Sequence, residues 1–264
     1  WATTTVAIGK KNKLEIIKEI HFPHSLGLLY SAFTYYTGFK VNSGEYKLMG
    51  LAPYGKPIYK DVIKEKLLDL KNDGSFKLNM KYFNYTTGLT MTNQKFSKLF
   101  DHPVRDSKKD LLTQFHMDIA ASIQTVTEEI VLKITKNISQ EYKIKNLCLA
   151  GGVALNCVAN GKIHNEKFFD NIWIQPAAGD AGGSLGAALA LWYIDQGNER
   201  IINPNDDMAG SYLGREFSQD EIEDELKSIG ANYEVENYED LIEKTSDYLS
   251  KEKAIAWFQG RMEF

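Results

Sequence analysis

Apolar residues recur along the chain with two different spacings, and the change between them marks the expected elements. They alternate or cluster over residues 4–9 and 14–20, on either side of a lysine-rich turn, which predicts a β-hairpin. Helical spacing follows over residues 24–39 and returns over residues 110–136. We therefore expect a hairpin first, and then two helices that each carry a buried apolar stripe.

The pattern between these two helices is less regular. Residues 41–55 contain several glycines and a proline, which predicts a loop of the kind that often binds ligands. Residues 60–71 have the pattern of an amphipathic helix, and residues 75–100, rich in Phe, Tyr and Thr, predict one or two short hairpins. Ser107 and Asp110 have the spacing of a capping box, which indicates where the long second helix begins.

Two similar units occupy residues 146–156 and 171–189. Each is an apolar strand that stops at glycines and turns directly into a helix. Such a turn directs backbone N–H groups and the positive end of a helix toward one point, which suits phosphate. Neither unit contains the Gly-Lys-Ser/Thr of a P-loop or a dinucleotide-binding fingerprint. The pair therefore predicts a nucleotide or another phosphorylated ligand held between neighbouring loops.

Asp180 is the strongest candidate for chemistry in these units. It follows a strand directly and stands at the start of a helix, where a carboxylate can hold a metal beside phosphate or can cap the helix. Asn156 opens the first helix and is either a ligand for a ribose, base or acceptor hydroxyl or a solvated polar residue. The turn glycines that would let a ligand approach the backbone are Gly151, Gly152, Gly179, Gly182 and Gly183.

The chain beyond the second unit changes character. Residues 197–210 have the composition of a linker. The segment after it predicts, in order, a helix, a short strand, a second helix and a final strand: residues 218–230, 233–235, 240–251 and 254–258. Ser218 and Glu221 have the spacing of a capping box for the first of these helices.

Composition narrows the class of protein. The chain is 43% hydrophobic and 25% charged with a net charge of −4, which is ordinary for a globular protein and offers no basic stripe for nucleic acid. No run of apolar residues is long enough for a membrane span. The two cysteines, Cys148 and Cys157, do not form a disulfide framework, and we expect both to be buried thiols. A cytoplasmic location fits best.

Five segments carry distinctive sequences in a fixed order along nearly the whole chain. They include Phe-Pro-His-Ser-Leu-Gly, Ser-Gly-Glu-Tyr-Lys-Leu-Met-Gly, Ala-Gly-Gly-Val-Ala-Leu-Asn, Ala-Gly-Asp-Ala-Gly-Gly and Trp-Phe-Gln-Gly-Arg, within residues 22–30, 43–55, 149–156, 176–188 and 257–264. Together they resemble the carbamoyltransferase family of nodulation-factor and antibiotic-tailoring enzymes.

The resemblance implies an α/β domain of the actin, Hsp70 and sugar-kinase fold, which is ribonuclease H-like, with helical and hairpin insertions. It also implies that a C-terminal domain makes carbamoyl-adenylate from ATP and carbamoyl phosphate. The N-terminal domain then moves the carbamoyl group to a hydroxyl of a sugar or natural product, beside a divalent metal such as Fe²⁺. Asp180 corresponds to a metal ligand in this pattern. Residues on the nucleotide or acceptor side, or in loops that face the cleft, are Gly151, Gly152, Asn156, Ser25, Glu45 and Lys47.

The chain departs from the family at both ends. The family's metal-binding histidines and a further Asp precede the position of Trp1, and most of the adenylating domain follows Phe264. We therefore expect residues 1–200 to be a carbamoyltransferase N-terminal domain without its start. Residues 201–264 would be a linker and the beginning of the C-terminal domain, and the fragment alone would be inactive.

Two other functions fit the same glycine turns. A sugar or acetate kinase of this fold would also place glycine turns and an Asp around ATP, but it would release ADP instead of AMP and pyrophosphate. A nucleotide-binding module without catalytic activity would use the same contacts and turn over nothing.

Overall fold

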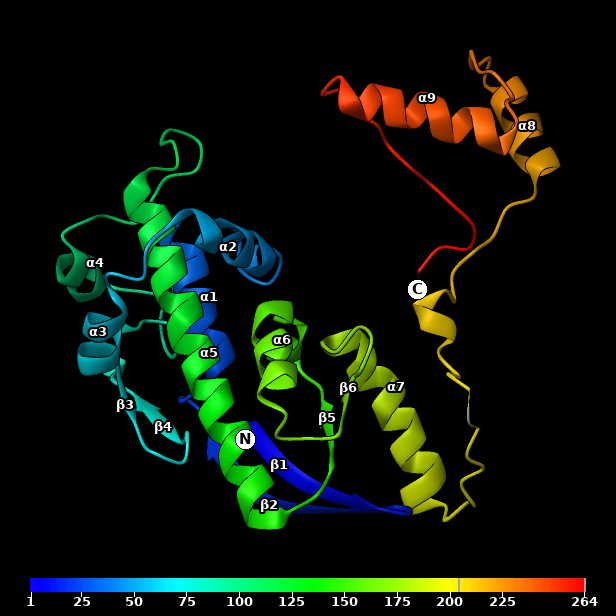
Figure 1. Cartoon of the computed structure of the whole chain (residues 1–264). Coiled ribbons are helices and arrows are strands. Elements are labelled where there is room, and N and C mark those ends of the chain that lie inside the picture. Colours follow the sequence, from blue (N-terminus) through cyan, green and yellow to red (C-terminus); the bar gives the residue numbers. More distant parts are fainter. Residues whose placement is uncertain (204, 264) are drawn as a thin grey trace. The chain divides into compact units, whose positions relative to one another are not determined.

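The computed structural model describes residues 1–203 and 205–263. Contacts divide the chain into two compact units, Trp1–Arg200 and Ile201–Phe264, and each unit is described by itself (Figure 1). All residues of the two strand–turn–helix units belong to the first.

The predicted hairpin is present at the start of the first unit. Strands β1 (Ala2–Lys10) and β2 (Lys13–His21) pair antiparallel over almost their full length, with Lys10 opposite Lys13 at the turn. The register shifts twice along the ladder, which accommodates two irregular positions in an otherwise continuous ribbon.

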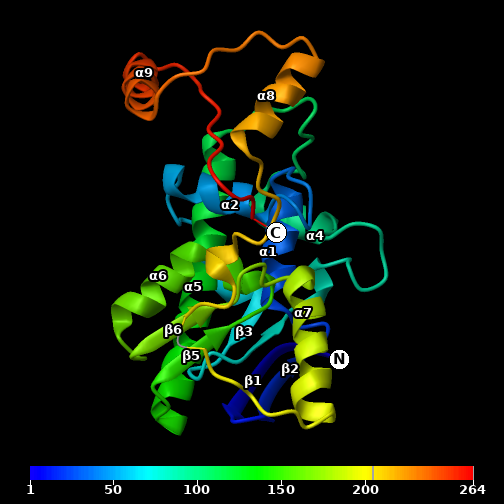
Figure 2. The same cartoon turned by 90° about the vertical axis from the view of Figure 1, so that its right-hand side faces the viewer.

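The core of this unit forms around two helices, α1 (Leu26–Tyr36) and α5 (Gln114–Tyr142). Both were predicted from their apolar periodicity. The two helices lie side by side in both views (Figures 1 and 2), and α5 buries Ile119, Ile123 and Ile130 completely.

The predicted start of α5 was wrong. Its capping box is formed by Thr113 and His116, whose side chains each bond the other residue's backbone N–H group. The Asp110 carboxylate instead accepts from the backbone N–H of Asp106 at 3.0 Å and stabilises the loop before the helix.

The loop predicted for residues 41–55 contains a helix. Helix α2 (Glu45–Leu51) runs directly into a 3₁₀ turn at Ala52–Tyr54. Leu48 is fully buried and Leu51 almost so, and both belong to the core around α5. Tertiary packing therefore outweighs the low helix propensity of this glycine-containing segment.

Residues 60–100 also differ from the prediction. The expected amphipathic helix is a short one, α3 (Lys60–Val62), with a π-helical continuation over Ile63–Leu67. The last residues of the predicted helix instead form strand β3 (Leu68–Leu70), which pairs antiparallel with β4 (Phe76–Leu78). Part of the second expected hairpin is helix α4 (Gln94–Phe100), which the Asn93 side chain caps.

Both strand–turn–helix units form as predicted. Strand β5 (Asn146–Leu149) leads through a 3₁₀ turn at Gly152–Leu155 into α6 (Cys157–Glu166). Strand β6 (Asn171–Ile174) leads into α7 (Asp180–Ala190), and the two strands pair in parallel. The described structure is thus mixed α/β with three two-stranded sheets.

The second unit contains helices α8 (Gln219–Ser228) and α9 (Tyr238–Ser250). The predicted capping box of Ser218 and Glu221 is present. The predicted strands at residues 233–235 and 254–258 are wrong, because both segments are irregular. The end of the unit returns to its beginning, where Gly214 donates to the Met262 carbonyl at 2.8 Å.

No helix within residues 1–203 and 205–263 combines the length and the apolar composition needed to cross a bilayer.

Candidate functional site

The two glycine turns meet at one end of the β5–β6 pair. The strands are in register from Asn146 opposite Asn171 to Leu149 opposite Ile174, so their carboxyl ends coincide. Gly151 lies just beyond β5 and donates its N–H to the Ala178 carbonyl of the second turn at 2.7 Å. Gly151 has φ of +92°, which residues with a side chain rarely adopt, so glycine is required for this contact.

The second turn winds tightly into α7. Gly179 precedes the helix, and Gly182 donates back to the Ala177 carbonyl at 2.8 Å. A methyl group added at Gly182 would lie 2.5 Å from that oxygen, so any larger residue would push the turn apart. Asp180 is the first residue of α7 and is exposed. The N–H groups of a helix's first residues have no partner within the helix, and here they can meet an anion.

The Asn156 side chain supports the first turn from the protein interior. This side chain is buried and accepts from the backbone N–H of Ala159 at 3.0 Å, which caps α6. Its amide also forms two hydrogen bonds with the Gln124 amide, each 3.0 Å long. Asn156 therefore faces the interior in this structure, with Gln124 and Ala159 as its partners, and its interpretation as a solvated polar residue is wrong. Direct contact between Asn156 and a ligand stays a prediction that requires an exchange of these partners.

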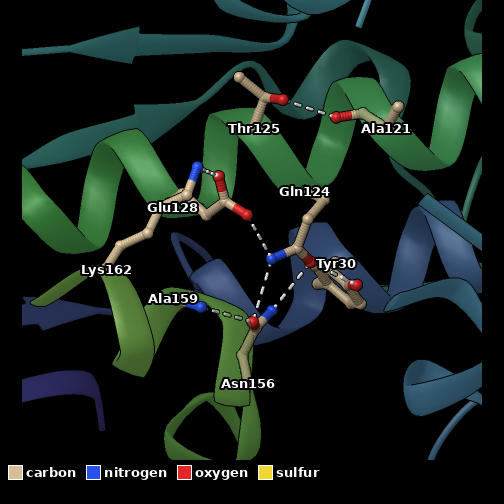
Figure 3. Close-up of polar contacts among 8 residues, drawn as sticks. All are labelled: Tyr30, Ala121, Gln124, Thr125, Glu128, Asn156, Ala159 and Lys162. Carbon is tan, nitrogen blue, oxygen red and sulfur yellow. Dashed lines mark hydrogen bonds and ion pairs between the residues drawn. The ribbon is translucent and has the colours of Figure 1, made fainter. Parts of the chain in front are cut away.

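Gln124 is the centre of a buried polar network (Figure 3). Its carbonyl oxygen accepts from the Tyr30 hydroxyl at 2.9 Å, and its amino group donates to the Glu128 carboxylate at 2.9 Å. The other Glu128 oxygen pairs with Lys162 of α6. Burial raises the pKa of Tyr30, and the nearby Glu128 and Glu45 raise it further, so the phenol keeps its proton and donates.

This network was missing from the sequence prediction. Gln124 and Glu128 stand four residues apart on α5, which places both on one face of the helix. Buried polar side chains need hydrogen-bond partners. The signal in the sequence was therefore this polar pair, which lies beside the apolar stripe of the helix.

The three predicted loop residues have different surroundings, and two of them contact α1. Ser25 is buried and caps α1 by accepting from the backbone N–H of Leu28 at 3.1 Å. The Glu45 carboxylate accepts from the Ser31 hydroxyl at 2.8 Å, which joins α2 to α1. Lys47 is exposed, and its ammonium group lies 5.8 Å from the centre of the Tyr46 ring.

These contacts bring four of the five distinctive segments together. A methyl group added at Gly27 of α1 would lie 3.6 Å from Val153 of the first turn. Cys157, at the start of α6, lies 4.0 Å from the sulfur of Met49 in α2. Residues 22–30, 43–55 and 176–188 therefore each contact the first glycine turn or the residue that follows it, while residues 257–264 belong to the other unit.

The described residues of this chain contain no complete set of metal ligands. Within residues 1–203 and 205–263, no three His, Cys, Asp or Glu side chains are grouped closely enough to hold an ion. The assignment of Asp180 as a metal ligand stays a prediction, and no chemical step is derived through a metal.

The prediction of two buried thiols was wrong. Cys148 and Cys157 are both exposed and free. Leu147 of β5 is buried while its neighbour Cys148 is exposed, because successive side chains of a strand point to opposite faces.

Comparison with known proteins identifies the family. Residues 1–189 match the family model described as carbamoyltransferase N-terminus. The chain belongs to this family. The match includes the hairpin, both glycine turns and nearly all of α7, and so contains every predicted site residue.

Several curated proteins are similar over most or all of the chain. An uncharacterised protein of Synechocystis sp. is 61% identical over the whole chain, which covers 43% of that protein. Nodulation protein NolNO of Sinorhizobium fredii is 32% identical over the whole chain and 36% of its own length. Nodulation protein NolO of Bradyrhizobium diazoefficiens is 30% identical over 94% of the chain and 43% of its own length. The chain thus spans about two fifths of these relatives.

Proposed function

We propose that the complete gene product containing this chain is an ATP-dependent O-carbamoyltransferase. Carbamoyl phosphate would supply the carbamoyl group, carbamoyl-adenylate would carry it, and a hydroxyl of a sugar or natural product would receive it. The family match over residues 1–189 carries the proposal. The contacts of four distinctive segments at two touching glycine turns support a phosphate-bearing ligand at that point.

The chain's own residues suggest how the transfer would be assisted. The first N–H groups of α7, at Asp180 and Ala181, would bind the phosphate of the adenylate. Gly151 and Gly182 would keep the two turns close enough to act on one ligand. The acceptor hydroxyl would lose its proton to solvent, its oxygen would form a bond to the carbamoyl carbon, and the bond from that carbon to the phosphate oxygen would break, so that AMP leaves. Fixed backbone donors beside the leaving phosphate would stabilise the charge that develops there.

The product of ATP cleavage tests the proposal. The complete gene product would be incubated with ATP, with and without carbamoyl phosphate, and AMP, ADP and pyrophosphate would be quantified. Pyrophosphate release that requires carbamoyl phosphate is expected. ADP formation with a sugar and no response to carbamoyl phosphate would indicate a kinase, and an absence of nucleotide turnover would indicate a binding module.

A further inference from the structure

A cavity of about 470 Å³ lies between the C-terminal end of α1 and the loop of residues 84–91. This volume is in the range of small-molecule sites, which extends from roughly 300 to 1,000 Å³. The first glycine turn packs near Gly27, at the other end of α1. A rise of 1.5 Å per residue separates Gly27 from Tyr35 by about 12 Å along the helix, so the cavity is distinct from the glycine turns.

Hydrogen bonds hold the loop that forms one wall. The Asn84 backbone N–H donates to the Met91 carbonyl at 3.0 Å, and the Asn84 carbonyl accepts from Gly88 at 2.7 Å. The Asn84 side chain donates to the Thr90 hydroxyl at 2.9 Å, and the Tyr85 hydroxyl donates to the Pro23 carbonyl at 2.7 Å. The cavity is therefore formed before any ligand arrives, which reduces the ordering cost of binding.

Apolar side chains dominate the lining. Tyr35 and Phe39 contribute aromatic rings from α1 and the residues after it, and Tyr85 contributes a third from the loop. Leu89 stands at the tip of the anchored loop with its side chain fully exposed, at 105% of the reference area. An apolar residue held in water beside an apolar cavity gains free energy when a ligand covers it.

The charge at the cavity is positive. Lys40 is the single Lys, Arg, Asp or Glu among the lining residues, and it makes no ion pair with any residue that the structure describes. The Arg105 guanidinium lies 5.9 Å from the centre of the Phe39 ring, which adds a second positive group nearby. An exposed cation at the rim of an apolar cavity suits a ligand that combines a ring with an anion.

We propose that this cavity binds an amphipathic anion, namely a planar apolar ring system that carries one carboxylate, sulfonate or phosphate group. The ring packs against Tyr35, Phe39 and Leu89, and the anion pairs with the Lys40 ammonium group. This proposal does not depend on the carbamoyl-transfer reaction, because it uses neither glycine turn.

Calorimetric titration of the complete gene product with naphthalene-2-sulfonate tests the proposal. We expect saturable binding, with much weaker binding of the neutral analogue 2-naphthol and of methanesulfonate, which has no ring. Lys40→Ala should weaken naphthalene-2-sulfonate binding about fivefold, as for one partly exposed ion pair. Lys40→Arg should retain the affinity, and Leu89→Ser should also weaken it.

Two matched variants control for effects on folding and for unspecific binding. Lys77→Ala removes another exposed lysine, and Leu111→Ser removes another exposed leucine, and neither residue lines the cavity. Both should bind naphthalene-2-sulfonate like the unmodified protein. The proposal is wrong if the probe does not bind, if 2-naphthol binds equally well, or if Lys40→Ala and Leu89→Ser bind the probe like the matched variants.

Discussion

The side-chain amides of Gln124 and Asn156 face each other and exchange two hydrogen bonds, each 3.0 Å long (Figure 3). Gln124 lies in the middle of the long helix α5, and Asn156 lies at the junction of the first glycine turn and α6. This pair fixes the turn on the core without using any atom of the turn itself. The backbone of Gly151 and Gly152 stays exposed while its support is buried.

Loss of Gln124 should therefore be costly. Gln124→Leu leaves the Asn156 amide, the Tyr30 hydroxyl and one Glu128 oxygen without their partner, and we expect a loss of about 2–4 kcal/mol in the free energy of unfolding. Gln140→Leu, on an exposed position of the same helix, should change it by less than about 0.5 kcal/mol. Urea unfolding measures both, and equal effects would show that the network contributes nothing specific.

Gly55 is another position at which the structure allows only glycine. A methyl group there would lie 2.0 Å from the Met117 carbonyl oxygen of α5, so Gly55→Ala has to displace the end of the 41–55 segment. We expect destabilisation by at least about 2 kcal/mol. Gly50→Ala, in α2 with open space around it, should instead stabilise by about 0.5–1 kcal/mol. Thermal unfolding separates the two, and a neutral Gly55→Ala would contradict the close approach.

The same segment shows what the sequence could and could not predict. Periodicity identified α1 and α5, and the glycine-bounded strands identified both halves of the site, because these signals are local. Helix α2 was missed because Gly44, Gly50 and Pro53 lower its helix propensity, whereas burial of Leu48 against α5 is a long-range effect. The Gln124–Asn156 pair joins residues 32 positions apart, and no local pattern predicts such a contact.

Acid should weaken the start of α5. Burial lowers the pKa of His116 below its ordinary 6.5, and the nearby Arg105 and His102 lower it further. The folded state thus holds fewer protons than the unfolded state between the folded pKa and 6.5. Stability is complete above about pH 6.5 and falls as the pH drops toward the folded pKa. Protonation also removes the acceptor for the Thr113 backbone N–H, at 3.1 Å.

Urea unfolding between pH 5 and 7.5 measures this effect. His116→Gln retains an acceptor suited to a capping box and cannot titrate, so it should flatten the pH dependence in that window. His164→Asn, which replaces an exposed histidine, should leave the dependence unchanged. If the stability of His116→Gln depended on pH as strongly as that of the unmodified protein, another group would cause the pH dependence.

Substitution of Gly182 tests whether the second turn is part of the ligand site. Gly182→Ala would force the turn away from Ala177 and misplace the first N–H groups of α7. In the complete gene product we expect a loss of carbamoyl-transfer activity on the order of 10²-fold, typical of a misplacement near 1 Å. Gly186→Ala, on the same helix with open space around it, should keep the activity within about twofold. Equal activities would exclude this turn from the site.

The most direct test of carbamoyl transfer measures a labelled carbamoyl group and the AMP product in the same reaction. The complete gene product would receive ATP, carbon-14-labelled carbamoyl phosphate and a mixture of sugars and glycosides, and label in acceptors would be compared with AMP formed. We expect ATP-dependent labelling with one AMP for each labelled acceptor, and little of either with Gly182→Ala. Formation of ADP without any labelled acceptor would contradict it.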